Sequence, residues 1–183
     1  MTPGIATSLF TGIYTDTGGF KYDSTVPETL AIASELARIA PNFAKPLLTM
    51  ENSNTREKLI FEGLALSDIR LECGGKLAIA VVSHKDLVSN NIGREDMSSH
   101  TISNMLKSVE GWDIGLCMIE VEPSVIKMSF RTRDSQKYDL SKVATALGGG
   151  GHRGAAGVHM HATIPEAIEK VKAAVGALIE GEK

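Results

Sequence analysis

Four consecutive glycines, Gly148 to Gly151, run directly into His152 and Arg153 in the stretch "GGGGHRGAAG". A glycine loses more backbone freedom on folding than any other residue, so a run of glycines is costly. Such a run is retained where the chain turns in a way that a Cβ forbids, or where another molecule comes close to the backbone. The residues leave two interpretations open: a site where backbone N–H groups bind an anion, or a helix C-cap followed by a turn.

The charge around the glycine run is positive, although the whole chain of 183 residues has a net charge of −3. Asp134 and Asp139 are the only acidic residues between positions 127 and 153, against six basic ones: Lys127, Arg131, Arg133, Lys137, Lys142 and Arg153. Any affinity for phosphate must therefore come from this local cluster, since the chain has no overall basic field. The lysines of the cluster are interpreted as a solvated strand face. His159 and His161 share one strand face but have no third ligand nearby, which favours a structural role.

Hydrophobic periodicity predicts an α/β (α+β) domain over residues 71–183. Short strands flank Cys73-Gly74-Gly75, and an amphipathic helix covers residues 102–109. "WDIGLCMIEVE" and "SVIKMSFRT" are expected to pair as antiparallel strands, with Lys127, Ser129 and Arg131 on one face of the second. A helix capped by Asp139, a strand around "AGVHMH" and a helix capped by Thr163 with Glu166 complete the domain.

Before residue 71 the pattern is weaker. A helix is predicted over 27–40, a connection with two prolines and three asparagines over 41–54, and a helix over 54–70. Little structure is expected in front of Thr15-Asp16-Thr17, and this N-terminal piece is expected to lack a core of its own. The domains predicted are 1–52, a linker helix at 53–70, and 71–183.

Composition excludes several classes of protein. The chain has no basic start followed by an apolar run, so a signal peptide is not expected, and no apolar stretch approaches the roughly 20 residues of a membrane helix. Cys73 and Cys117 lack the spacing of a metal site, which indicates buried thiols in a reducing compartment. We therefore expect a cytoplasmic protein with no membrane partner.

At this point the motifs resemble a known family. "YTDTGGF" near the start, "SFRT", and "DLSKVATALGGGGHRGAAG" are similar to the DHH phosphoesterases that carry a DHHA1 domain, in particular the oligoribonuclease and 3′-phosphoadenosine-5′-phosphate (pAp) phosphatase branch. The resemblance implies that 71–183 is a complete DHHA1 domain with a mixed sheet and flanking helices. It also implies that 1–52 is the C-terminal remnant of a DHH catalytic domain.

The resemblance assigns roles to individual residues. Asp16 matches a metal-binding aspartate of a catalytic centre that holds two divalent ions, with manganese as the expected metal. Arg131 matches an arginine that contacts the substrate phosphate, and Thr132 a hydroxyl donor beside it. Gly149, Gly150, Gly151 and His152 match the substrate loop. The implied partner is a short RNA or a nucleotide, and a homodimer is a further expectation.

The chain also departs from the family pattern. None of the fifteen residues before Asp16 is Asp, Glu or His, and no Asp-His-His occurs. One aspartate cannot hold two ions, so we expect this chain to be inactive alone and to be a truncated gene, a split gene or a fragment. Three hypotheses stay open: part of a phosphoesterase completed by a separate chain, a nucleic-acid-binding module without catalysis, and a fragment with loosely held N-terminal residues.

Overall fold

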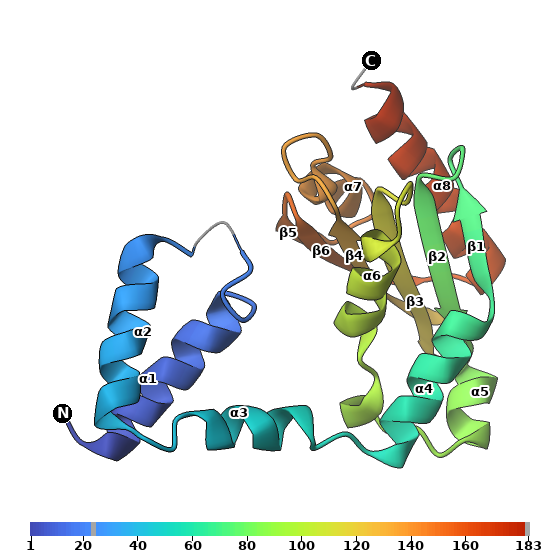
Figure 1. The fold of residues 1–183 in the computed structure, drawn as a ribbon. Helices are drawn as coiled ribbons and strands as arrows, with labels where there is room; N and C mark the ends of the chain where they lie inside the picture. The colour runs from blue at the N-terminus through green and yellow to red at the C-terminus, as the bar shows by residue number, and fades with distance from the viewer. Residues whose placement is uncertain (23–24, 182–183) are drawn as a thin grey trace. The chain divides into compact units, whose positions relative to one another are not determined.

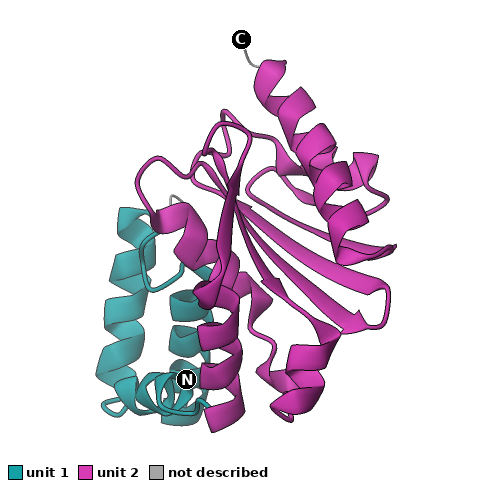
Figure 2. Cartoon of the chain, turned by 90° about the vertical axis from the view of Figure 1, so that its right-hand side faces the viewer, with its two compact units in different colours: residues 1–54 teal, residues 55–183 magenta. Residues whose placement is uncertain are grey.

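The computed structural model describes residues 1–22 and 25–181, and it divides into two compact units, residues 1–54 and 55–183 (Figure 2). The last residues of the predicted 71–183 domain, 182 and 183, lie outside the described part. None of the described helices is both long enough and apolar enough to cross a membrane.

The first unit is helical. It contains α1 (Pro3–Asp16), α2 (Pro27–Ile39) and α3 (Ala44–Glu51) (Figure 1). The expectation that this segment lacks a core is wrong, because Phe10 and Leu36 are buried with three alanines in a small apolar cluster. The Phe10 and Phe43 rings pack with centroids 4.5 Å apart.

Two helices of this unit were not predicted. Helix α1 has glycines at two positions, no acidic residue in its first turn and no basic residue in its last turn. Neither its periodicity nor its ends therefore predict a helix. Helix α3 lies inside the segment interpreted as a connection. Pro46 is the third residue of α3, and a proline is tolerated in the first turn because those N–H groups have no partner within the helix.

The second unit is a six-stranded mixed sheet with helices on both faces (Figure 1). This confirms the expected α/β class. The elements are α4 (Arg56–Ser67), β1 (Ile69–Glu72), β2 (Leu77–Val82), α5 (His84–Ser89), a 3-10 turn (Arg94–Asp96), α6 (Ser99–Ser108), β3 (Ile114–Glu122), β4 (Val125–Thr132), α7 (Leu140–Ala146), β5 (Gly150–His152), β6 (Ala155–His161) and α8 (Ile164–Glu180).

The strand order is β1-β2-β3-β4-β6-β5, and only the β2–β3 pair is parallel. One face carries Ile126, Met128 and Phe130 and packs against α7 and α8. The other face packs against α4, α5 and α6 through a second apolar cluster. The alternation predicted for β4 is confirmed, since these three side chains are buried while Lys127 and Arg131 are half-buried on the opposite face.

Helix ends and the glycine run differ from expectation. The predicted helix 54–70 ends at Ser67, and Arg70 lies in β1. Its N-cap is Thr55, whose hydroxyl accepts from the Lys58 N–H at 3.0 Å. The glycine run was expected to be a loop, but Gly150–His152 forms the edge strand β5. Glycine has a low strand propensity, so this strand is created by its pairing with β6 rather than by its own sequence.

Candidate functional site at the glycine edge of the sheet

Three of the four glycines in the run are required by the fold itself. Gly148 follows α7 with φ of +80°, which suits glycine at a helix C-terminus. A Cβ on Gly149 would lie 2.2 Å from the Gly157 carbonyl oxygen. Gly151 has φ of +148°, and its Cβ would lie 2.5 Å from Cα of Ala156. At these three positions the local backbone conformation or the neighbouring strand therefore excludes a side chain.

Gly150 is different. A Cβ there would meet no atom within 4 Å, and its φ lies outside the left-handed region. Gly157, its partner across the β5–β6 pair, would bring a Cβ only to an ordinary 3.6 Å from the Met128 carbonyl oxygen. Directly paired residues face the same side of a sheet, so the two glycines leave a bare patch of backbone there. Neither a neighbouring atom nor a left-handed φ requires glycine at these two positions, so the patch is open to another molecule.

Basic side chains border the bare patch. Arg131 on β4 pairs with Ala155 on β6, which pairs with His152 on β5. Arg131 and His152 therefore share one row and one face of the sheet, with the small Ala155 between them. Two strand spacings separate their backbones, about 10 Å. The structure thus brings the predicted arginine and histidine to the same surface.

The register adds a second row. Lys127 on β4 pairs directly with His159 on β6, on the same face as Arg131. A pocket of ≈290 Å³ lies over these rows. Its lining residues are Ser99, Lys127, Met128, Ser129, Arg131, Gly150, Gly151, Ala155, Ala156, Gly157 and His159. We call this the glycine-floored pocket. Of the predicted substrate-binding residues, Arg131, Gly150 and Gly151 line this pocket. Thr132, Gly149 and His152 do not.

Thr132 is held inside the fold. It is only 4% exposed, and its hydroxyl donates to the Asp113 carbonyl oxygen at 3.1 Å and accepts from the Asp134 N–H at 3.2 Å. These bonds fasten the end of β4 to the loop that follows it. The structure therefore gives this hydroxyl a structural role.

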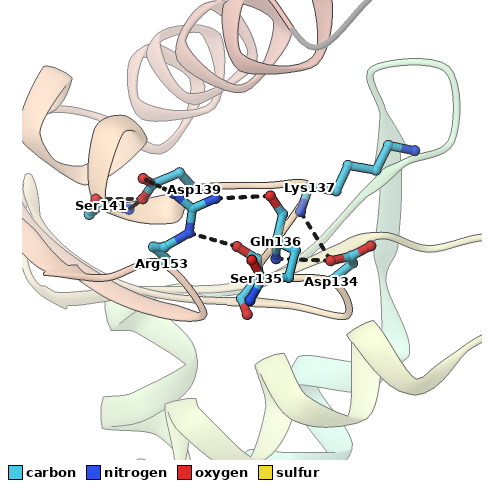
Figure 3. A network of polar contacts seen from close by, with 7 residues as sticks. All are labelled: Asp134, Ser135, Gln136, Lys137, Asp139, Ser141 and Arg153. Atoms are coloured by element: carbon cyan, nitrogen blue, oxygen red, sulfur yellow. Dashed lines mark hydrogen bonds and ion pairs between the residues drawn. The ribbon is translucent and has the colours of Figure 1, made fainter.

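Arg153 is committed to the structure as well (Figure 3). Its guanidinium pairs with the Asp139 carboxylate at 3.0 Å and donates to the carbonyl oxygens of Ser135 and Gln136, each at 2.9 Å. The Asp139 carboxylate also accepts from the Ser141 N–H at 3.1 Å and so caps α7. The turn between β5 and β6 is thereby tied to the loop before α7.

Helix α6 contributes one residue, Ser99, to the lining of the glycine-floored pocket. Gly115 on β3 lets this helix lie close to the sheet, because a Cβ there would lie 2.3 Å from the Ser103 carbonyl oxygen. Ser103 also donates to the Ser129 hydroxyl at 3.4 Å. The first residue of the helix, Ser99, is 6% exposed and lines the pocket. A hydroxyl at a helix N-terminus is a favourable neighbour for an anion.

The electrostatic field around α6 is positive. Burial lowers the pKa of His100, and the cations Arg131, Lys58 and Lys127 lower it further. Burial and the charges of Arg131 and Arg133 likewise lower the pKa of Lys107. Cations on α4 and β4 thus act on His100 in the first turn of α6, and Arg131 also acts on Lys107 near the other end of this helix.

We expect an anion in the pocket to reverse the shift of His100. Its midpoint, followed by NMR in the free protein, should lie below the ordinary value of about 6.5, because the charged ring is disfavoured. Bound phosphate groups stabilise the charged ring, so the titration midpoint of His100 should rise when an anion binds. Binding should therefore tighten as the pH falls through the midpoint of His100. Arg131→Ala should raise the midpoint of the free protein. A midpoint above 6.5 in the free protein, or one unmoved by a bound nucleotide, would contradict this.

The expected metal site is not assembled by the described residues. Asp16 is exposed at the C-terminal end of α1. Among residues 1–22 and 25–181, no three His, Cys, Asp or Glu side chains are grouped so that they could hold a metal ion. A two-metal centre needs several such ligands, so the described residues do not fit one by themselves.

Sequence reasoning missed part of this site. Lys127 was interpreted as a solvated residue and His159 as structural, yet both line the pocket. Lys127 could have been found, because it lies two residues from Ser129 and four from Arg131 on the same strand face. Ser99 could not, since only the packing of α6 against the sheet brings it to the pocket.

Together, these features define an α/β domain with a mixed sheet. Its edge is the glycine-containing hairpin of β5 and β6, and cationic side chains border this hairpin. The model of the DHHA1 domain family matches residues 74–181. This is more than half of the chain, which therefore belongs to the DHHA1 domain family. The resemblance to DHH phosphoesterases with a DHHA1 domain is thereby confirmed.

Individual relatives agree with this family. The bifunctional oligoribonuclease and PAP phosphatase NrnA of Thermus thermophilus is 33% identical over 177 residues, covering 95% of this chain and 51% of the relative. The protein of the same name from Mycoplasma pneumoniae is 27% identical over 157 residues, covering 86% and 46%. The chain thus spans about half the length of these curated relatives.

A solved structure shows the same fold. An exopolyphosphatase-related protein from Bacteroides fragilis matches 100% of this chain and 52% of its own, with a TM-score of 0.87 and 23% identity. At this identity the match supports the fold alone.

Proposed function

We propose that the second unit binds phosphate groups of a short oligoribonucleotide or of a nucleoside 3′,5′-bisphosphate, as the substrate-binding part of a DHH-type phosphoesterase. The names of the two curated relatives supply the substrate classes. Within the chain, Arg131 and Lys127 supply charge-assisted donors, and Ser99 at the α6 N-terminus lines the same pocket.

One observation carries this proposal. Gly150 and Gly157 are paired, line the same pocket and are not required to be glycine by any neighbouring atom or by their φ angles. Bare backbone beside an arginine is what a phosphate needs for close approach, because no Cβ stands in its way. The end of α7 explains Gly148, and close contacts with β6 explain Gly149 and Gly151, but neither explains this pair.

The proposal is tested by titrating the chain with adenosine 3′,5′-bisphosphate at two salt concentrations. Binding should weaken as salt rises, because phosphate contacts displace counterions. Arg131→Ala should weaken binding at least about tenfold and reduce the salt dependence, since a charge-assisted hydrogen bond contributes about 1.5–3 kcal/mol. Arg70→Ala, on the far strand β1, removes the same charge and should leave affinity unchanged. Absence of binding at low salt, or equal affinities of the Arg131 variant and the parent, would contradict the proposal.

Hydrolysis is not assigned to the described residues. Asp16 supplies one carboxylate, and we propose that it joins a divalent-metal centre, with manganese as the expected ion, that side chains of another segment or a separate chain complete. The second candidate function is a nucleic-acid-binding module without catalysis. It is favoured by the fact that every residue lining the glycine-floored pocket belongs to the second unit. Manganese-dependent cleavage of a dinucleotide by the pure chain, lost in Asp16→Ala, would exclude this candidate.

A further inference from the structure

A second pocket adjoins the glycine-floored pocket. Its volume is ≈280 Å³, and Lys127 and His159 line both. The remaining lining residues are Arg94, Met97, Val121, Glu122 and Val125. We call it the distal pocket. Because Lys127 and His159 are paired across β4 and β6, this row of the sheet forms the boundary between the two pockets.

Both pockets lie on the same face of the sheet. Val125 precedes Lys127 by two residues on β4, so the two side chains share a face. Met97 and Val121 pack against the apolar cluster on the α4–α6 side of the sheet. From Arg131 to Val125 the groove follows six residues of one strand, about 20 Å. The hydrogen-bond partners of a phosphate lie about 3 Å from its oxygens, so a single phosphate can occupy only a part of this groove.

The chemistry of the distal pocket differs from that of the glycine-floored pocket. Its own lining includes three apolar side chains, those of Met97, Val121 and Val125. Its arginine, Arg94, is paired with Glu122 at 3.2 Å, so this pair adds no net charge. A phosphate gains little in such a place, and the Glu122 carboxylate would repel it. A flat base can contact these apolar side chains and stack on the plane of the Arg94 guanidinium. The Arg94 side chain is 84% exposed and is therefore accessible to a base.

We propose that the distal pocket holds the base of a second nucleotide, with the phosphate that links the two nucleotides beside Lys127 and His159. Resting on the proposed function, this inference makes a dinucleotide or longer oligonucleotide the preferred ligand over a nucleoside bisphosphate. The sizes agree with it: each pocket alone falls just below the about 300 Å³ at which small-molecule sites begin, whereas the joined groove falls within their range.

The inference is tested by comparing two ligands with the same number of phosphate groups. Adenosine 3′,5′-bisphosphate and the 5′-phosphorylated dinucleotide pApA each carry two. They differ by the second nucleoside and by the lower negative charge of the linking phosphodiester, which by itself would favour the bisphosphate. Isothermal titration of the full chain should give a dissociation constant about tenfold lower for pApA, as expected for one stacked base. Arg94→Ala and Val125→Glu should each remove this advantage, so that pApA no longer binds more tightly than the bisphosphate. Both variants add negative charge near Lys127, so each should also weaken the affinity for the bisphosphate, but by less than that for pApA. Arg70→Ala should change neither, and the thermal midpoint of each variant reports whether it is folded.

The outcomes separate the two proposals. Equal affinities for the two ligands, both weakened by Arg131→Ala, would overturn the distal pocket and leave the proposed function intact. A tighter pApA complex that Arg94→Ala and Val125→Glu do not affect would also overturn it, because the second base would then bind elsewhere. If neither ligand binds, or if Arg131→Ala has no effect on either, both proposals fail.

Discussion

Gly151→Ala should remove about 3 kcal/mol from the free energy of unfolding. The added Cβ would lie 2.5 Å from Cα of Ala156 and 2.6 Å from the Ala155 carbonyl oxygen. Both are backbone atoms of the adjacent strand, so no side chain can rotate away. The φ of +148° adds backbone strain, and each of these two effects costs about 1–3 kcal/mol. Urea unfolding followed by circular dichroism measures the loss.

A matched glycine provides the control. Gly176 lies within α8, where a Cβ would meet no atom within 4 Å. Gly176→Ala should therefore stabilise the protein by up to about 1 kcal/mol, because alanine is the better helix former. A loss below about 1 kcal/mol for Gly151→Ala would show that β5 moves away from β6 without cost, and would contradict the structural role given to this glycine.

Gly150→Val, unlike Gly151→Ala, should leave the free energy of unfolding unchanged. It should lower the affinity for a nucleotide by at least about 30-fold. Its Cβ has free space on the protein side, and a β-branched residue suits a strand. The valine would instead fill the floor of the glycine-floored pocket and hold a phosphate away from the backbone. We take a steric cost of about 2 kcal/mol, within the range measured for overfilled sites. Titration with adenosine 3′,5′-bisphosphate, paired with a thermal melt, measures both properties.

Gly157→Ala tests the same floor from the neighbouring strand. Its smaller side chain should weaken binding less than Gly150→Val does, again without loss of stability, since its Cβ makes only an ordinary contact. Gly176→Ala should leave affinity unchanged. Unaltered affinity in Gly150→Val would mean that the bare patch is not the ligand floor, and would remove the observation on which the proposed function rests.

The sequence predicted those parts of the fold in which the local pattern and the tertiary packing agree. The pairing of β3 with β4 followed from the turn at Pro123-Ser124 between them, and the faces of Lys127 and Met128 followed from alternation. The caps of α7 and α8 were also predicted, because Asp139 and Thr163 make the hydrogen bonds that their positions favour. Helix α1 was missed because its stability comes from packing, such as that of Phe10, rather than from a strong pattern.

The candidate site was predictable to a similar extent. The family motifs named Arg131 and the glycine run, and the sheet register places them at one pocket. The motifs did not separate Gly150 from Gly149 and Gly151, because the difference depends on which neighbouring atoms a Cβ would meet. Thr132 follows Arg131 in sequence and therefore points to the opposite side of the strand. Its hydroxyl there donates to the Asp113 carbonyl oxygen.

The network around Arg153 has a thermodynamic consequence. Its three bonds to the loop before α7 fix the β5–β6 turn before any ligand arrives. A pre-organised edge loses little conformational entropy on association, so more of the contact energy remains as affinity. In the binding proposed above, Arg153 would therefore contribute without lining the pocket, by holding the β5–β6 turn in place in the free protein.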